Sequence, residues 1–213
     1  MKPWQDHFDA LFAAYPVLEP VREEISKAFL ILRQCVDAKA KILVCGNGGS
    51  AADCEHIVGE LMKGFWLKRP LSQTDKEKFS AIPGGAEIAN RLQGGIQAIS
   101  LVSQTGLISA FANDVDAALV YAQQVYAYAD KPEDVLIALS TSGNSLNVVN
   151  AAKTAKAAGI RVISMTGAAG GQLSAFSDAA IRLPADAPAP VQELTLPVYH
   201  ALCAMLEAAF FQE

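Results

Sequence analysis

Short apolar runs alternate with helical patterns along the 213 residues of this chain, and this alternation limits the folds open to it. The runs are 41–45, 97–101, 134–139 and 161–165, with a weaker fifth at 180–183. The stronger runs each lead into a turn. Strands that alternate with helices form parallel sheets that are covered on both faces. We therefore predict an α/β fold, a three-layer αβα sandwich built on a five-stranded parallel sheet.

The rest of the chain divides into helices and one segment without a core pattern. Residues 1–38 form an N-terminal helical segment that breaks near Tyr15 and Pro16, since apolar positions recur there at helical spacing. Further helices are predicted over about 50–62, 107–111, 145–158 and 191–211. Residues 72–95 are polar and then glycine-rich, and can be a lid, an interface arm or a surface insertion. We treat residues 1–213 as one domain.

Composition argues against several classes of function. The formal net charge is -5 and the pI about 5.2, which is unlike the basic footprint of nucleic-acid-binding domains. The N-terminus lacks a signal-peptide pattern, and the apolar runs are too short for a membrane-spanning helix. The four cysteines form no C-x-x-C pair and are typical of reduced thiols. We expect a cytoplasmic protein with no nucleic-acid or membrane partner.

Hydroxyl and amide side chains fill the turn after the run 134–139. They are Ser140, Thr141, Ser142, Asn144 and Ser145. Together with the free N–H groups of the helix that follows, such side chains can surround a phosphate. An ordinary capped turn would need only one residue of this kind, so we predict phosphate binding here.

A glycine-rich turn, Cys45 to Ser50, ends the first apolar run. Its glycines, Gly48 and Gly49, let the backbone approach a ligand closely, and Ser50 is a natural N-cap for the next helix. By itself the turn is equally consistent with a tight strand-to-helix connection. It is not a G-x-G-x-x-G fingerprint and no Walker lysine follows, so we expect no nucleotide cofactor.

Two pairs of polar residues lie at helical spacing on different helices. His56 and Glu60 are four residues apart and Gln192 and His200 eight, so each pair faces one way from its helix. A solvated polar face would have the same spacing. However, the apolar neighbours of His56 and Glu60 indicate a buried helix, where the pair needs partners. If the last helix packs alongside, Gln192 and His200 supply them, for acid–base chemistry or for a divalent metal such as Zn²⁺.

The order of these segments resembles that of the SIS (sugar isomerase) family, and most strongly its phosphoheptose isomerase branch. The resemblance rests on the C-G-N-G-G-S turn, the H-x-x-x-E helix, Asn113-Asp114, the S-T-S-G-N-S loop, the T-G-x-x-G-G turn at 166–171 and the Q-E…H of the last helix. It covers nearly the whole chain except 72–95, an insertion relative to the family pattern. On the residues alone, Asn113-Asp114 reads as a helix end.

The resemblance implies a flavodoxin-like SIS domain that converts D-sedoheptulose 7-phosphate to D-glycero-D-manno-heptose 7-phosphate, toward nucleotide-activated heptose. It implies Glu60 and His200 as the acid–base pair, and a homotetramer with active sites shared between subunits. It implies one zinc ion per subunit, with possible ligands His56, Glu60, Gln192 and His200. The substrate contacts that it implies are Asn47, Gly48, Gly49, Ser50, Glu60, Asn113, Asp114, Ser140, Thr141, Ser142, Ser145 and Gln192.

The reaction expected from this resemblance is an enediol proton transfer, in which Glu60 and His200 share the carbon and oxygen protons and the order stays open. Two other functions also stay open. An isomerase or sensor of another sugar phosphate would have the same phosphate grip. A non-catalytic tetrameric adaptor for a replication initiator protein would have the same fold, but the known adaptors depart from the isomerase pattern at the positions of Glu60 and His200.

Overall fold

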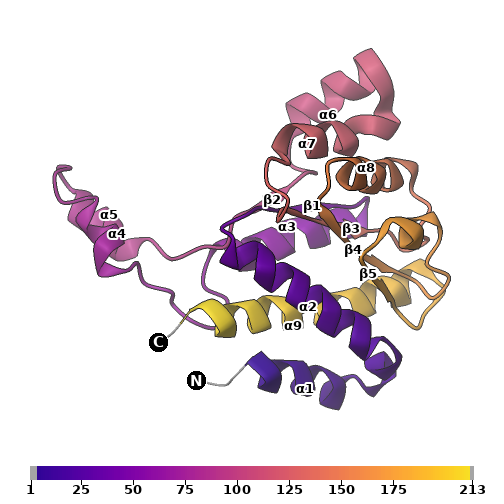
Figure 1. Ribbon diagram of the computed structural model, residues 1–213, viewed down its shortest axis with the longest axis horizontal. Coiled ribbons are helices and arrows are strands. Elements are labelled where there is room, and N and C mark those ends of the chain that lie inside the picture. Colours follow the sequence, from indigo (N-terminus) through magenta and orange to yellow (C-terminus); the bar gives the residue numbers. More distant parts are fainter. Residues whose placement is uncertain (1–3, 212–213) are drawn as a thin grey trace.

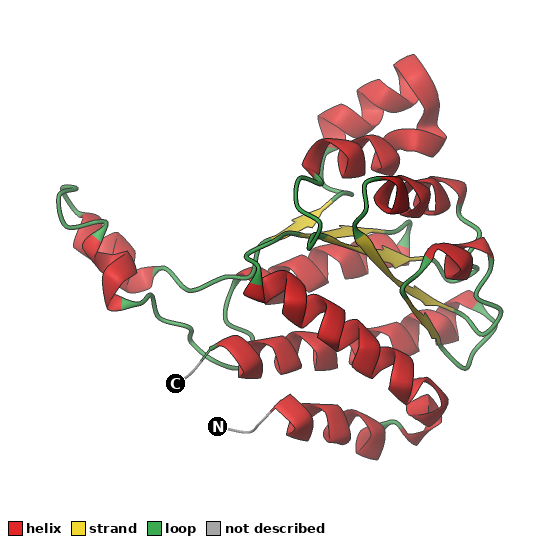
Figure 2. Ribbon diagram, in the orientation of Figure 1, coloured by secondary structure: helices red, strands yellow, loops and turns green. Residues whose placement is uncertain are grey.

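Five parallel strands form the sheet at the centre of the computed structural model, which describes residues 4–211 (Figures 1 and 2). They are β1 (Ile42–Cys45), β2 (Ala98–Ser100), β3 (Val135–Leu139), β4 (Arg161–Thr166) and β5 (Ala179–Arg182). Their order is β2-β1-β3-β4-β5, and every neighbouring pair is parallel. The predicted fold class is confirmed. This order places the topological switch point of the sheet between β1 and β3.

Helices cover both faces of the sheet, which gives three layers (Figure 2). One face is covered by α2 (Arg22–Asp37), α3 (Gly49–Met62) and α9 (Pro188–Phe210), with α1 (Trp4–Ala14) packed against α9. The other face is covered by α6 (Thr105–Phe111), α7 (Val120–Tyr128) and α8 (Leu146–Ala157). Successive strand residues point to opposite faces. Val44 and Ile137 therefore join the first core, while Leu43 and Ala138 join the second.

The strand predictions are accurate to one residue at either end, because buried parallel strands are continuous apolar runs. The predicted break near Tyr15 is also confirmed, where the 3-10 turn η1 (Pro16–Val21) separates α1 from α2. The structure adds α7 and the short turns η2 (Ala112–Asp116), η3 (Ala117–Leu119) and η4 (Gln172–Phe176). Ser50 as the N-cap of α3 was wrong: Gly48, with a φ of 57°, holds that position and Ser50 lies buried inside the helix.

The C-terminal helix α9 has 23 residues and packs against α1, α2 and α3. Most of its second half is buried, from Pro197 to Glu207. Within residues 4–211, no helix combines the length and the apolar composition needed to cross a membrane. Its burial and its contacts make α9 a core helix that brings its side chains to the neighbouring helices.

Residues 71–92, which we call the arm, project from the body of the molecule (Figure 1). The arm carries α4 (Gln73–Glu77) and α5 (Gly85–Arg91), and an isolated antiparallel bridge between Pro70 and Gln93 closes its base. α4 has no buried residue, and Ile82, Ile88 and Leu92 are exposed. That residues 72–95 are an insertion relative to the family pattern stays a prediction.

Candidate functional site

Two loops meet at the carboxyl ends of β1 and β3, beside the switch point of the sheet. The side-chain amides of Asn47 and Asn147 donate to each other over 2.8 and 2.9 Å, which ties the loop after β1 to α8. The Tyr121 hydroxyl donates to the Gly46 carbonyl over 2.7 Å. The predicted glycine-rich turn therefore lies beside the helix that follows the hydroxyl-rich loop, in the crevice where open α/β sheets bind ligands.

The loop at residues 140–145 has the chemistry of an anion site. Ser140 Oγ donates to Ser145 Oγ over 3.0 Å, so two of its hydroxyls already lie together. Ser145 is the N-cap of the 12-residue helix α8, and its side chain caps none of the helix N–H groups. The first turn of α8 contains no acidic residue, so the positive end of the helix dipole is not neutralised there. A phosphate would supply that negative charge.

Gly143 allows this loop to pack tightly against the turn at 167–171. Its φ is 67°, and a Cβ there would lie 2.1 Å from the Gly170 carbonyl oxygen. The Leu173 N–H donates to the Gly143 carbonyl and the Gly167 N–H to the Thr141 carbonyl, both over 2.9 Å. These backbone contacts fix the loop and with it the hydroxyls that it carries.

Helices α3 and α9 run side by side in the same direction, which confirms that the last helix packs alongside the first predicted pair. Gln192 lies at the start of α3, because a Cβ on Gly49 would be 2.6 Å from Gln192 Nε2. About two turns further along both helices, His200 reaches His56. Residues that are 143 or 144 positions apart in the sequence therefore meet in register.

His56, Glu60 and His200 form one polar cluster between these helices. Nε2 of His56 lies 3.3 Å from Glu60 Oε1 and 3.4 Å from Nε2 of His200. Glu60 also forms an ion pair with Lys63 over 2.7 Å. The His56 side chain is 42% exposed, so α3 buries only one face rather than most of its surface. Burial and the neighbouring His56 lower the pKa of His200, which favours a neutral imidazole that can accept a proton at neutral pH.

Three residues of the cluster were not found from the sequence. Lys63 binds Glu60 as described, Tyr199 lies 2.9 Å from His56 Nδ1, and the same hydroxyl donates to Asp53 over 3.3 Å. Tyr199 is buried and stands in an apolar helix, so its sequence context reads as core. Burial raises the pKa of both Tyr199 and Asp53, while the hydrogen bond between them lowers that of Asp53. The available signals were local spacings: Asp53 is three residues before His56, and Lys63 three residues after Glu60.

The remaining predicted residues do not join this cluster within one chain. Gln192 is eight residues before His200, or about 12 Å along a helix. Asn113 and Asp114 lie exposed in η2, and Asn113 donates to Asp114 over 2.8 Å. Among the described residues, no hydrogen bond links either of them to another predicted site residue. Their role in substrate binding stays a prediction.

The cluster has the ligand types of a zinc site. Two histidines and one glutamate are a known ligand set of catalytic zinc, which leaves a fourth position open. The separations of 3.3 and 3.4 Å are close to the edge of about 3.4 Å that tetrahedral ligands at about 2.1 Å would span. Within residues 4–211, however, no group of three or more His, Cys, Asp and Glu is placed to hold a metal. The chemistry of the donors fits zinc, with Gln192 outside the set.

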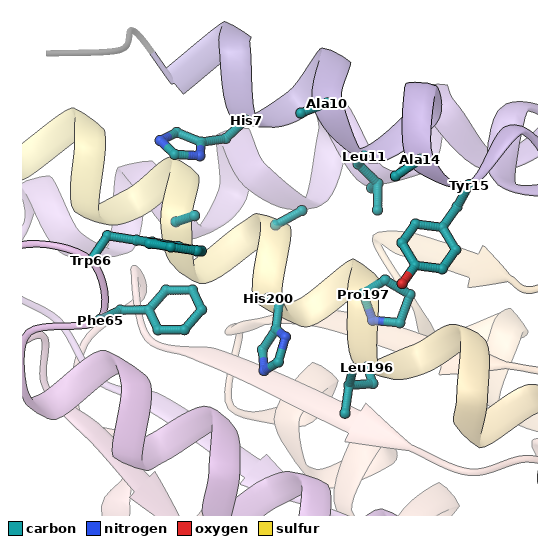
Figure 3. Close-up of a pocket in the computed structure, with 12 residues that line it drawn as sticks. His7, Ala10, Leu11, Ala14, Tyr15, Phe65, Trp66, Leu196, Pro197 and His200 are labelled. Carbon is teal, nitrogen blue, oxygen red and sulfur yellow. The ribbon is translucent and has the colours of Figure 1, made fainter.

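An apolar cavity of about 250 Å³ lies between α1 and α9, next to the cluster (Figure 3). Phe65, Trp66, Leu196 and His200 are among its lining residues. The rings of Phe65 and His200 are 5.4 Å apart, and Trp66 is 72% exposed. His200 therefore belongs both to the polar cluster and to the wall of this cavity.

Comparison with known proteins identifies the family. The chain matches the SIS domain over residues 9–76 and 77–167. It is 36% identical to a phosphoheptose isomerase of Helicobacter pylori (strain P12) over 91% of this chain and 88% of that protein. Its structure resembles the phosphoheptose isomerases of Neisseria gonorrhoeae (TM-score 0.73, 29% identity, covering 95% and 96% of the two chains) and Francisella tularensis (0.74, 26%, 95% of each). The chain therefore belongs to the SIS domain family, in its phosphoheptose isomerase branch.

Proposed function

We propose that this member of the phosphoheptose isomerase branch converts D-sedoheptulose 7-phosphate to D-glycero-D-manno-heptose 7-phosphate. The observation that carries the proposal is the contact of the Glu60 carboxylate with His56, which in turn contacts His200. Such a cluster can move protons, and the helix that carries Glu60 begins in the crevice beside the phosphate-suited loop. The names of the similar proteins support the choice of a heptose phosphate. The product is a precursor of nucleotide-activated heptose.

The phosphate and the reacting carbons lie at opposite ends of the open-chain sugar. The phosphate binds to hydroxyls of the 140–145 loop and to the N–H groups at the start of α8. The hydroxyls are those of Ser140, Thr141, Ser142 and Ser145. Anchoring that end limits where C1 and C2 can lie, which lowers the entropic part of the barrier. Asn47, Gly48, Gly49 and Gln192 lie at the start of α3 and are the proposed contacts of the sugar hydroxyls. Ser50, also expected there, is buried, and its contact stays a prediction.

Glu60 and His200 perform the proton transfers. One takes the proton from C1 of the ketose, which gives an enediol. The proton exchanges with solvent while the acid–base group holds it, and a proton is then returned to C2. The other moves the hydroxyl proton from the oxygen on C1 to the one on C2, so the aldose forms with no net change in protons. Positioned acid–base groups contribute about 10²–10⁴-fold each. His200 suits this role, since its lowered pKa keeps it neutral at neutral pH.

A zinc ion would be held by His56, Glu60 and His200, the three donors that lie together. When bound, it supplies a positive charge that polarises the sugar carbonyl. Gln192 would complete this set only if another copy of the chain brought it near.

The distance of several predicted site residues from the polar cluster supports an assembly with shared active sites, which we propose is a homotetramer. Gln192, Asn113 and Asp114 lie apart from the cluster in one chain, and exposed apolar residues such as Trp66 surround it. Four free, buried cysteines are consistent with the cytoplasm, where thiols stay reduced.

Co-expression of Glu60→Gln with Asn113→Ala chains tests whether active sites are shared between subunits: mixed assemblies should recover activity that neither variant has alone. No recovery would mean that each chain builds its own site.

Glu60→Gln tests the reaction most simply. We expect the wild type to convert sedoheptulose 7-phosphate, and Glu60→Gln to lose turnover while it still binds the sugar phosphate. Glu55→Gln is the matched control, because Glu55 lies on the same helix and instead accepts from Ser100 over 2.8 Å. Normal turnover in Glu60→Gln would remove Glu60 from the mechanism. Wild-type turnover of another sugar phosphate alone would move the proposal to that substrate. Inactivity on every heptose and hexose phosphate, with capture of an initiator protein, would favour the adaptor.

A further inference from the structure

A buried tyrosine connects the polar cluster to a carboxylate on its far side. The Tyr199 hydroxyl lies 2.9 Å from His56 Nδ1 and donates to Asp53 Oδ1 over 3.3 Å. Tyr199 is 1% exposed, while Asp53 is half-buried and the His56 side chain is 42% exposed. Asp53 and His56 are three residues apart on α3, and the tyrosine reaches both from α9. The three side chains form a short hydrogen-bonded relay behind His56.

The number of protons determines the direction of this relay. A phenol has one proton to donate, and an ionised carboxylate only accepts. If the hydroxyl proton goes to Asp53, the oxygen of Tyr199 must accept from His56, whose Nδ1 then carries a hydrogen. The reverse arrangement would turn the proton away from Asp53, for which the described hydrogen bonds give no other donor. A charge-assisted bond to a carboxylate is also stronger than one to a neutral imidazole.

We infer that Asp53 and Tyr199 are positioning residues that hold neutral His56 in its Nδ1–H form, with the Nε2 lone pair directed at Glu60 and His200. The inference deepens the proposed function of this site and rests on it only for its catalytic consequence. Histidines that bind metals are held in a chosen tautomer in the same manner, by a partner of the other ring nitrogen.

The consequence is that the side of His56 that faces Glu60 and His200 carries no proton. Nε2 of His56 lies 3.3 Å from a Glu60 oxygen and 3.4 Å from His200 Nε2. With its lone pair on that side, His56 cannot donate to the Glu60 carboxylate. Either the His200 Nε2–H donates to His56 Nε2, or a cation lies between the three side chains. In the opposite tautomer, His56 would donate to Glu60 and the cluster would satisfy itself.

Nitrogen NMR of the imidazoles tests this directly. The chain has three histidines, so the ¹⁵N-labelled spectrum is simple, and His200→Gln and His7→Gln assign it. The spectrum is recorded at a pH where the rings are neutral, on the full chain as purified and again after chelation of divalent metals. We expect His56 to be protonated on Nδ1 in both samples. Protonation on Nε2 in the chelated protein would overturn the inference.

Two variants separate the relay from a general structural effect. In Asp53→Asn the new amide can donate to Tyr199, which frees the phenol proton for His56 Nδ1, so the tautomer should shift toward Nε2–H. Tyr199→Phe should give a mixture, and if it does not fold, Asp53→Asn still decides. Glu55→Gln also replaces a carboxylate by an amide on the same helix, and it should leave the tautomer of His56 unchanged. An Asp53→Asn spectrum like the wild type, or an equal shift in Glu55→Gln, would contradict the relay.

Kinetics report the catalytic consequence separately. We expect Asp53→Asn to lower kcat by about 10–100-fold, the usual effect of losing a partner behind a functional histidine, with little change in KM. If the wild type does not turn over heptose phosphate, the proposed function fails while the NMR result still stands. If the tautomer shifts as expected and kcat does not change, the relay exists but has no role in catalysis, which overturns its functional part.

Discussion

At the scale of single residues, the close approach of Gly49 and Gln192 is the tightest constraint in the site. A Cβ on Gly49 would lie 2.6 Å from Gln192 Nε2 and 2.8 Å from its Oε1. The obstacle is the end of a flexible side chain, so Gly49→Ala should move Gln192 rather than unfold the chain. We expect its kcat/KM to fall by about tenfold or more, since small misplacements in a site reduce rate strongly. Steady-state kinetics and a thermal melt would measure the two effects.

Gly59→Ala is the control for this substitution. Gly59 lies on the same helix, and a Cβ there would meet nothing within 4 Å. Alanine should stabilise α3 by about 0.5–1 kcal/mol and leave the kinetics unchanged. An equal loss of activity in both variants would show that α3 responds to any added methyl group, and not that Gln192 is displaced.

The sequence identified the main residues of the site but not their support. Helical spacing was enough to pair His56 with Glu60, and the packing of α9 brought His200 to them as expected. Lys63 lies three residues after Glu60, a local spacing that could have been recognised. Tyr199 could not be predicted, because its role depends on the register between α3 and α9. That register is a tertiary contact between segments more than 140 residues apart, and no local pattern encodes it.

At the scale of elements, a buried ion pair joins the end of α3 to α9. Arg69 Nε donates to Glu207 Oε1 over 2.7 Å, and both side chains are almost fully buried. Glu207 also accepts from the N–H groups of Phe65, Trp66 and Leu67, at 2.7 to 3.1 Å. Arg69 donates to the carbonyls of Leu61 and Glu60 at the end of α3. This pair therefore fixes the loop that carries Phe65 against His200.

Glu207→Gln should destabilise the protein strongly. It leaves the buried Arg69 charge without its partner, which costs about 3–5 kcal/mol in comparable pairs. Glu87→Gln is the control, because the pair of Glu87 with Arg91 spans 3.7 Å and is about 80% exposed on both sides. Urea unfolding of both variants is the measurement. Similar midpoints would mean that the buried pair adds no more than an exposed one.

The arm should be removable without loss of the fold. The bridge from Pro70 to Gln93 closes its base, so the two ends of the arm already lie next to each other. α4 and α5 have five and seven residues, too short to be stable alone. We expect a chain with residues 71–92 replaced by a short glycine linker to melt within a few degrees of the wild type. Collapse of the circular dichroism spectrum would show that the arm supports the body.

The helices that the sequence did not indicate lack a clear apolar stripe, for two different reasons. α4 and α5 bury almost nothing, so they have no apolar stripe to detect. α7 buries Gln124, which donates to the carbonyls of Leu101 and Val120, so a polar residue occupies a core position. The strands of the sheet were predictable because they are buried on both faces.

At the scale of the whole molecule, the four cysteines report on global stability. All are free and buried, and burial raises the pKa of Cys35, Cys45 and Cys203 to about 12, and that of Cys54 further. An unfolded thiol has a pKa of about 8.5 and reacts as the thiolate. At pH 8 we expect no labelling of the native protein by a thiol reagent and labelling of all four after unfolding. Rapid native labelling of one cysteine would reveal local opening around it.

The raised thiol pKa values also set the direction of a pH effect. The folded state keeps the thiols neutral, so their contribution to stability is fully present below about pH 8.5 and is lost as the pH rises toward 12. Unfolding midpoints measured above pH 9 should therefore fall less in a variant with these cysteines replaced by alanine than in the wild type.

We propose that this chain interconverts sedoheptulose 7-phosphate and its aldose through an enediol. The most direct measurement is the reaction in D₂O, followed by proton NMR until equilibrium, with Glu60→Gln beside the wild type. We expect aldose product with solvent deuterium at C2 for the wild type and no product for the variant. Product that stays free of deuterium throughout, or a variant as active as the wild type, would contradict it.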